Sequence, residues 1–195
     1  MQKIMFNDRY HHTNAVIEER KTRATQIMAG IDFPVNMVMG RVLPDKDGKI
    51  YAVANGENII VKLRYKVGEV VAVAQSYYHA FSPRCDIPVY GADRTPGWRN
   101  KLFVRADLMP HQIRIIGIRC ERLRDISDEE CIKEGVYAGS QALEYPYYFI
   151  DTKQFLICDY KSPREAFAAL IDKVSGRGTW DRNPWVVVYE FELVK

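Results

Sequence analysis

Residues 65–74 read YKVGEVVAVA, and this stretch gives the strongest fold signal in the sequence. A glycine turn is followed by an uninterrupted, valine-rich apolar run, which is typical of a strand buried inside a sheet. Segments 59–63 and 113–123 are also rich in β-branched apolar residues. Along 185–194 one alternate set of positions is wholly apolar, the pattern of a half-buried strand. The sequence therefore predicts a sheet built around the valine-rich run.

Three short helices are expected to flank this sheet. The first covers about residues 13–19. The second starts with a capping box at 127–130, runs to about Glu134 and stops at Gly135, a residue suited to a left-handed helix end. The third spans 162–176, with its own capping box and a proline at the first helical position.

Two segments, 76–100 and 136–160, lack clear periodicity and are predicted to be loop-rich insertions. Several strands with few helices predict an α+β fold, in the form of a small mixed β-barrel flanked by short helices. The chain has 195 residues, 47% of them hydrophobic, which is enough for one domain spanning 1–195.

The expected cellular compartment and the expected lack of a cofactor are inferred from features that the sequence lacks. No apolar leader opens the chain, and no apolar stretch is long enough to span a bilayer. The four cysteines form no CxxC pair, and His11-His12 has no cysteine or carboxylate motif beside it. We therefore expect a cytoplasmic protein with reduced cysteines that binds no membrane, no metal and no cofactor.

A basic segment runs from Arg94 to Arg124. It holds eight basic side chains against only Asp107 and Glu121, although the whole chain has a net charge of only +3. The basic residues alternate with rings such as Trp98, so the segment could line a path for phosphates with rings for base stacking. An ordinary solvated strand face rich in arginine explains the pattern equally well.

Four parts of the chain form an ordered set. They are the Glu-Arg-Lys-Thr run at 19–22, the strand element at 65–76, the stretch 109–135 with its MPH, IRI and RCERL runs, and the tail 183–191. In this order and spacing they resemble the ASCH family, and specifically its phage- and prophage-associated branch.

The resemblance implies a PUA-like β-barrel that binds RNA or a modified nucleoside in a cleft between barrel and helix. Some small members of the family are amidohydrolases that act on N-acetylated cytidine with a Lys, a Thr three residues later and a Glu near the end of the second helix. The Lys falls on Lys21 and the Glu on Glu134, but the Thr position holds Ala24. We expect Thr22 and Thr25 to point elsewhere, so the sequence leaves open whether the chain is an enzyme.

Lys21 and Glu134 are thus the candidate catalytic residues, and a wider set could contact a ligand. That set is Arg20, Lys21, Thr22, Arg23, Tyr77, Trp98, Arg99, Lys101, Arg105, His111 and Arg114. A solvated turn explains Lys21 equally simply, and an exposed helix end explains Glu134. A Glu at that end, however, opposes the helix dipole, which hints at a role.

Three functions remain open from the sequence. The first is a module that binds RNA or a modified nucleoside. The second is a hydrolase of N-acylated nucleosides, weakened by Ala24. The third is a protein-interaction module of a phage or mobile element, since the two insertions add aromatic surface that a minimal barrel does not need.

Overall fold

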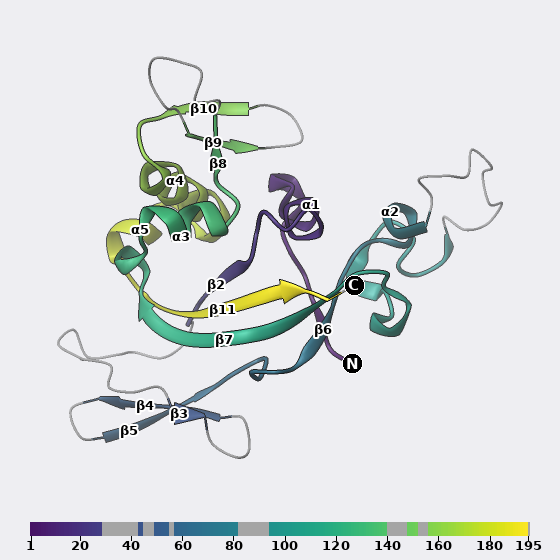
Figure 1. The fold of residues 1–195 in the computed structure, drawn as a ribbon, viewed down its shortest axis with the longest axis horizontal. Helices are drawn as coiled ribbons and strands as arrows, with labels where there is room; N and C mark the ends of the chain where they lie inside the picture. Colours follow the sequence, from purple (N-terminus) through teal and green to yellow (C-terminus); the bar gives the residue numbers. More distant parts are fainter. Residues whose placement is uncertain are drawn as a thin grey trace.

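A computed structural model describes residues 1–28, 43–44, 49–54, 57–81, 94–139, 148–151 and 156–194 (Figure 1). Its central feature is a five-stranded mixed sheet in the order β1-β6-β7-β11-β2. The strands are β1 (Lys3–Ile4), β6 (Val70–Val73), β7 (Gln112–Arg122), β11 (Trp185–Leu193) and β2 (Arg23–Ile27). β1 runs parallel to β6, and the other neighbours are antiparallel.

The predicted central strand is present as β6. Val71, Ala72 and Val73 have no solvent exposure, as expected for a valine-rich strand with a neighbour on each side. Around it, β7 and β11 form the long curved ribbon pair at the middle of the molecule (Figure 1). The prediction of strands at 70–74, 113–123 and 185–194 is therefore confirmed.

The expectation that 185–194 is half-buried is wrong for its first half. Every residue of β11 from Trp185 to Tyr189 is buried. Val187 and Tyr189 pack into one hydrophobic cluster, and Val186 and Val188 pack into another. Both faces of the sheet are covered here, so neither alternate set of positions reaches water.

Short helices cover the second of these clusters. α3 (Asp128–Lys133) and α4 (Pro163–Ser175) pack on each other, and α5 (Thr179–Arg182) packs on α4 (Figure 1). The predicted capping box of α3 is present, with Ser127 and Glu130 bonded reciprocally. At α4 only half of the predicted box forms, because the Glu165 carboxylate accepts from the amide of Lys161.

The remaining elements are short. The helices are α1 (His12–Ile17) and α2 (Tyr77–Phe81), with 3-10 turns η1 (Asp8–Tyr10), η3 (Lys101–Phe103), η4 (Ala106–Leu108) and η5 (Leu123–Asp125). Two small sheets consist of β3 (Leu43–Pro44), β4 (Lys49–Ala54) and β5 (Glu57–Lys62), and of β8 (Tyr137–Ala138), β9 (Tyr148–Asp151) and β10 (Leu156–Tyr160).

The sheet β10-β9-β8 corrects the prediction for 136–160. We expected a loop-rich insertion, but this stretch pairs into three antiparallel strands, and Ile150 of β9 is buried in the cluster beneath α4. Aromatic and β-branched residues favour strands when a packing surface is available, and α4 provides one. In the other predicted insertion, 76–100, the structure describes residues 76–81, which include α2, and residues 94–100, and the rest lies outside the described residues.

The α+β class is confirmed, with few helices around a mixed sheet. Within the described part of the chain the strands form an open five-stranded sheet and two smaller sheets, not a closed barrel. No helix in that part combines the length and the apolar character needed to cross a bilayer.

Candidate functional site

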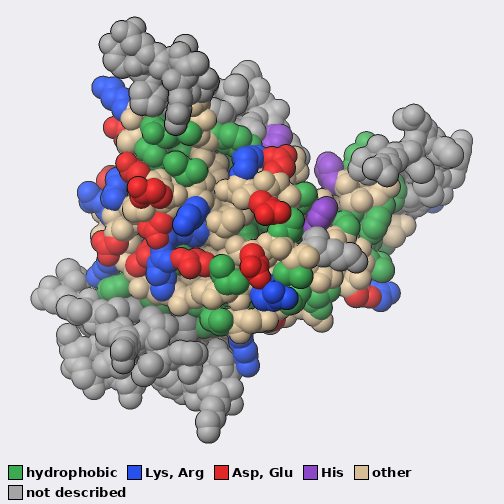
Figure 2. Space-filling view, in the orientation of Figure 1, with side chains coloured by type: hydrophobic (Ala, Val, Ile, Leu, Met, Phe, Trp, Pro, Cys, Tyr) green, Lys and Arg blue, Asp and Glu red, His purple; other side chains and the backbone are tan. Residues whose placement is uncertain are grey.

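Four of the eight basic residues in the segment 94–124 pair with carboxylates in the structure. Arg119 contacts three carboxylates, including that of Glu190 on β11, and Arg114 pairs with Glu192 at 3.0 Å. Figure 2 shows the result on one face, where Lys and Arg side chains are intermixed with Asp and Glu. The acidic residues of β11 were not counted from the sequence, because they lie outside the segment and only strand pairing brings them alongside.

The candidate ligand residues of this region lie apart from Lys21 and Glu134. Lys101 pairs with Asp8 at 2.8 Å, and Arg105 pairs with Asp107 at 2.6 Å. The Tyr77 hydroxyl accepts from the amide of Arg105, and Trp98 lies edge-on to Tyr78. None of Tyr77, Trp98, Arg99, Lys101, Arg105, His111 and Arg114 lines the cavity described below, and Arg99 borders a separate hollow with Ser76, Tyr78 and His79.

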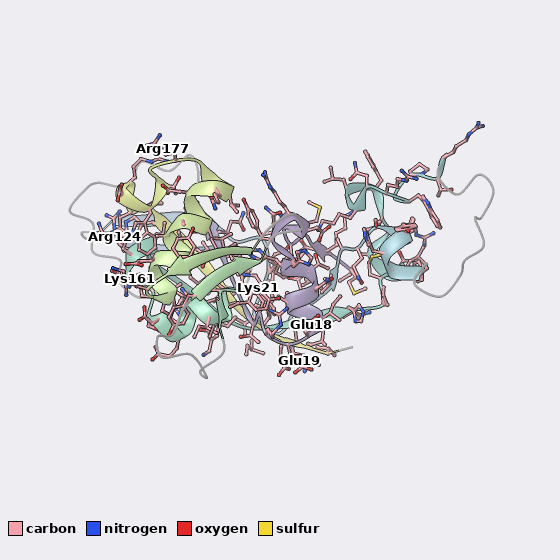
Figure 3. The ribbon with its side chains drawn as sticks, turned by 90° about the horizontal axis from the view of Figure 1, so that it is seen from above. Glu18, Glu19, Lys21, Arg124, Lys161 and Arg177 are labelled. Atoms are coloured by element: carbon pink, nitrogen blue, oxygen red, sulfur yellow. The ribbon has the colours of Figure 1, made fainter. Side chains whose placement is uncertain are left out.

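Lys21 is directed into the protein by the turn that ends α1. The amides of Arg20 and Lys21 both donate to the carbonyl of Ala15, at 2.8 and 2.9 Å. Glu19 adopts a left-handed backbone with φ 57°, a conformation that favours glycine. Lys21 is 3% exposed and lies near the centre of the molecule, whereas Glu18 and Glu19 lie at its edge (Figure 3). A solvated turn is therefore excluded for Lys21.

Glu134 directly follows α3 as its C-terminal cap residue and is also buried. Its amide donates back to the carbonyls of Glu130 and Cys131, and Gly135 follows with φ 102°, as predicted for a left-handed helix end. The residue is 4% exposed, so the alternative of an exposed helix end is wrong.

Lys21 and Glu134 converge, as the resemblance implied. Lys21 Nζ lies 2.7 Å from Glu134 Oε2 and donates to the backbone carbonyl of Glu134 at 2.5 Å. The ammonium of an ion pair has no lone pair with which it could act as a base. The geometry therefore favours Lys21 as a fixed positive charge and Glu134 as the proton acceptor.

Thr25 completes the cluster, against our expectation. Its hydroxyl donates to Glu134 Oε1, on the other side of the carboxylate from Lys21. Side chains along an extended chain alternate between two faces, so Lys21, Arg23 and Thr25 all reach Glu134. Ala24 falls on the opposite set, where it packs against the hydrophobic cluster of the sheet and also borders the cavity described below. The hydroxyl missing at the third position after Lys21 is thus present at the fourth.

Arg23 supports the carboxylate and is not available to a ligand. It is 1% exposed and contacts the carboxylates of Glu121, Glu130 and Glu134. Its Nε lies 3.4 Å from Glu134 Oε1 without hydrogen-bond geometry, so this contact is ionic and weakly directional. The prediction that Arg23 binds a ligand is therefore corrected to a role in holding Glu134.

The two remaining members of the predicted 20–23 ligand run lie outside the cluster. Arg20 pairs with Glu18 at 2.5 Å and stacks over the Tyr137 ring at 4.2 Å. The Thr22 amide donates to the carbonyl of Lys133, which ties the start of β2 to the end of α3. Neither residue lines the cavity that Lys21 shares with Glu134, and Thr22 instead borders a second hollow beside Lys21.

Beside the cluster lies a cavity of about 380 Å³. Lys21, Thr25 and Glu134 line it on one side, and α4 lines it with Phe167, Leu170, Ile171 and Val174. Phe6, Tyr65 and Tyr189 add aromatic surface, and Asn7, Gln26, Arg64 and His12 add polar groups. Burial raises the pKa of Tyr65 and that of Tyr189, so both phenols remain protonated at neutral pH.

The described cysteines do not line this cavity. Cys120 and Cys131 are free thiols. Burial raises the pKa of Cys120 to about 11 and that of Cys131 to about 12, so both stay unreactive at neutral pH. Among the described residues no group of histidine, cysteine and carboxylate side chains could hold a metal ion.

Gly135 brings Lys21 close to the ring of His12. A Cβ placed on Gly135 would lie 3.4 Å from His12 Cδ2 and 3.6 Å from Lys21 Cδ, which is ordinary van der Waals contact. We predict that Gly135→Ala lowers the free energy of unfolding by about 1–2 kcal/mol, because an alanine resists the left-handed backbone. Gly176→Ala is the matched control, with φ 100° and no atom within 4 Å. Urea denaturation should give similar losses, and a loss above about 3 kcal/mol at Gly135 alone would contradict the described packing.

Comparison with known proteins adds no relative. No protein-family model matches the chain, and neither a curated protein nor a solved structure is significantly similar to it.

Proposed function

We propose that the chain binds an N-acylated nucleoside in the cavity beside Lys21 and hydrolyses its acyl amide, on a fold of the PUA-like kind. The observation that carries this proposal is the buried contact of Thr25 and Lys21 with the two carboxylate oxygens of Glu134, at the wall of a cavity. A hydroxyl bonded to a carboxylate, with a fixed cation beside it, is an arrangement suited to acyl transfer.

The cavity suits a nucleoside in size and in lining. A volume of about 380 Å³ falls within the roughly 300–1,000 Å³ of small-molecule sites. Phe6 and Tyr189 offer ring surface for a base, and the amides of Asn7 and Gln26 offer donors and acceptors for its edge.

The charges favour a free nucleoside over an RNA chain. Only two cationic side chains, Lys21 and Arg64, line the cavity among the described residues, and Lys21 is already paired with Glu134. A polynucleotide needs several cations along its phosphates. The three arginines between 105 and 119 that could contribute are paired with carboxylates.

The proposed reaction proceeds in two steps. In the first, Thr25 Oγ1 attacks the acyl carbonyl carbon while its proton passes to Glu134, and the oxyanion develops near the Lys21 ammonium. The C–N bond then breaks, the leaving amine takes the proton from Glu134, and the acyl group stays on Thr25 as an ester. In the second, Glu134 takes a proton from water, which attacks the ester carbon. The ester C–O bond then breaks, Glu134 returns the proton to Thr25 Oγ1, and the free acid leaves.

The test is hydrolysis of cytidine acetylated on its exocyclic amine. We expect the wild type to release cytidine and acetate in equal amounts, measured by liquid chromatography, and Glu134→Gln to release neither. The same acetylated base inside a short RNA should react more slowly than the free nucleoside. Absence of cytidine release by the wild type over a range of pH would contradict the proposed hydrolysis.

A further inference from the structure

His12 lines the same cavity as Lys21, Thr25 and Glu134, although no motif in the sequence connects it with them. It is the first residue of α1, and its ring packs on Gly135, 3.7 Å from Nε2 to a Cβ built there. The same Cβ position lies 3.6 Å from Lys21 Cδ, so Gly135 holds the imidazole and the lysine side by side.

The imidazole of His12 has hydrogen-bonding groups that no described residue engages. Within the described residues, neither ring nitrogen has a hydrogen-bond or ion-pair partner, and neither is fully enclosed by protein atoms. The other polar members of the cluster are all engaged with one another. A polar group that faces a cavity without a protein partner is available to a ligand.

His12 is also uncharged at neutral pH. Burial, followed by the nearby ammonium groups of Lys21 and Lys101, holds the pKa of His12 well below its usual value. A neutral imidazole carries one N–H donor and can polarise a carbonyl without taking part in proton transfer.

We propose that His12 is a catalytic residue that donates its N–H to the carbonyl oxygen of the bound acyl group, beside Lys21. Two of the protons on Lys21 Nζ are already directed at Glu134, so a second donor is needed to hold the developing oxyanion from another side. His12 keeps its proton throughout, and no bond at the imidazole forms or breaks. This inference rests on the proposed hydrolysis and adds the group that completes its oxyanion site.

The experiment compares His12→Phe with wild type on acetylated cytidine. Phe keeps a flat ring against Gly135 but has no N–H, so kcat should fall about 10²-fold while KM changes by less than about threefold. His12→Asn or His12→Gln, whose amide N–H can reach the position of Nδ1 or Nε2, should recover about tenfold of this loss. His79→Phe, at an exposed histidine on α2, should match the wild type.

The outcomes separate this inference from the function on which it rests. An active wild type with an equally active, folded His12→Phe variant overturns the role of His12 and leaves the hydrolysis standing. If His12→Phe loses activity and neither amide variant recovers any of it, a donated hydrogen bond is also contradicted, because the shape of the side chain alone would then explain the loss. A wild type that releases no cytidine overturns the hydrolysis, and the role of His12 with it.

Discussion

Thr25→Val should lower kcat/KM for acetylated cytidine by at least about 10³-fold, because valine keeps the shape of threonine and removes the attacking oxygen. Thr25→Ser should stay within about tenfold of the wild type, since the hydroxyl can still donate to Glu134. The measurement is the initial rate of cytidine release at several substrate concentrations.

The controls for Thr25 separate loss of chemistry from loss of folding. Thr25→Val also removes a hydrogen bond to a buried carboxylate, so a loss of about 1.5–3 kcal/mol in unfolding free energy is expected, and circular dichroism must show a folded variant. Thr95→Val makes the same chemical change at an exposed turn and should leave the rate unchanged. A folded Thr25→Val variant with the wild-type rate would remove Thr25 from the reaction.

Lys21→Met should be the most destabilising single substitution at the site. Both side chains of the Lys21–Glu134 pair are about 95% buried, with exposures of 4% and 5%. Loss of the ammonium leaves a buried carboxylate with only the more distant Arg23 guanidinium to compensate it, which should cost about 3–5 kcal/mol. Urea denaturation followed by circular dichroism measures the change.

A double-mutant cycle tests whether this cost comes from the pair itself. Lys21→Met combined with Glu134→Gln removes both charges, so the double variant should recover a large part of the stability that Lys21→Met loses. Lys133→Met, at an exposed lysine of α3, should change stability by less than about 0.5 kcal/mol. A Lys21→Met variant as stable as the Lys133 control would mean that Lys21 is solvated in solution.

The hydrophobic pattern predicted well those strands that are themselves rich in apolar residues of the core. β6 is a valine run, and β7 and β11 each contribute several apolar side chains to the hydrophobic clusters. β2 was not predicted, because Arg23–Ile27 reads RATQI and has little strand character of its own. It is a strand because five of its residues register with β11 from Val186 to Glu190.

The site, too, has residues that were predicted from the sequence and residues that were missed. Spacing alone could not join Lys21 with Glu134, which are separated by 113 positions, and their convergence was expected only through the ASCH resemblance. Thr25 was missed because the motif was counted along the chain as three residues after the lysine. In an extended backbone every second side chain points to the same face. The further partners of Glu134 are therefore Arg23 and Thr25, two and four residues after Lys21. His12 was missed because nothing in the sequence indicates that α1 packs on the end of α3.

A crystal structure of the Glu134→Gln variant soaked with acetylated cytidine tests the account most directly, because this variant should hold the substrate without turning it over. The account predicts the nucleoside in the cavity beneath α4, with the acyl carbonyl carbon about 3–3.5 Å from Thr25 Oγ1 and its oxygen directed at Lys21 and His12. Density for the nucleoside elsewhere on the protein, or a Thr25 hydroxyl turned away from residue 134, would contradict it.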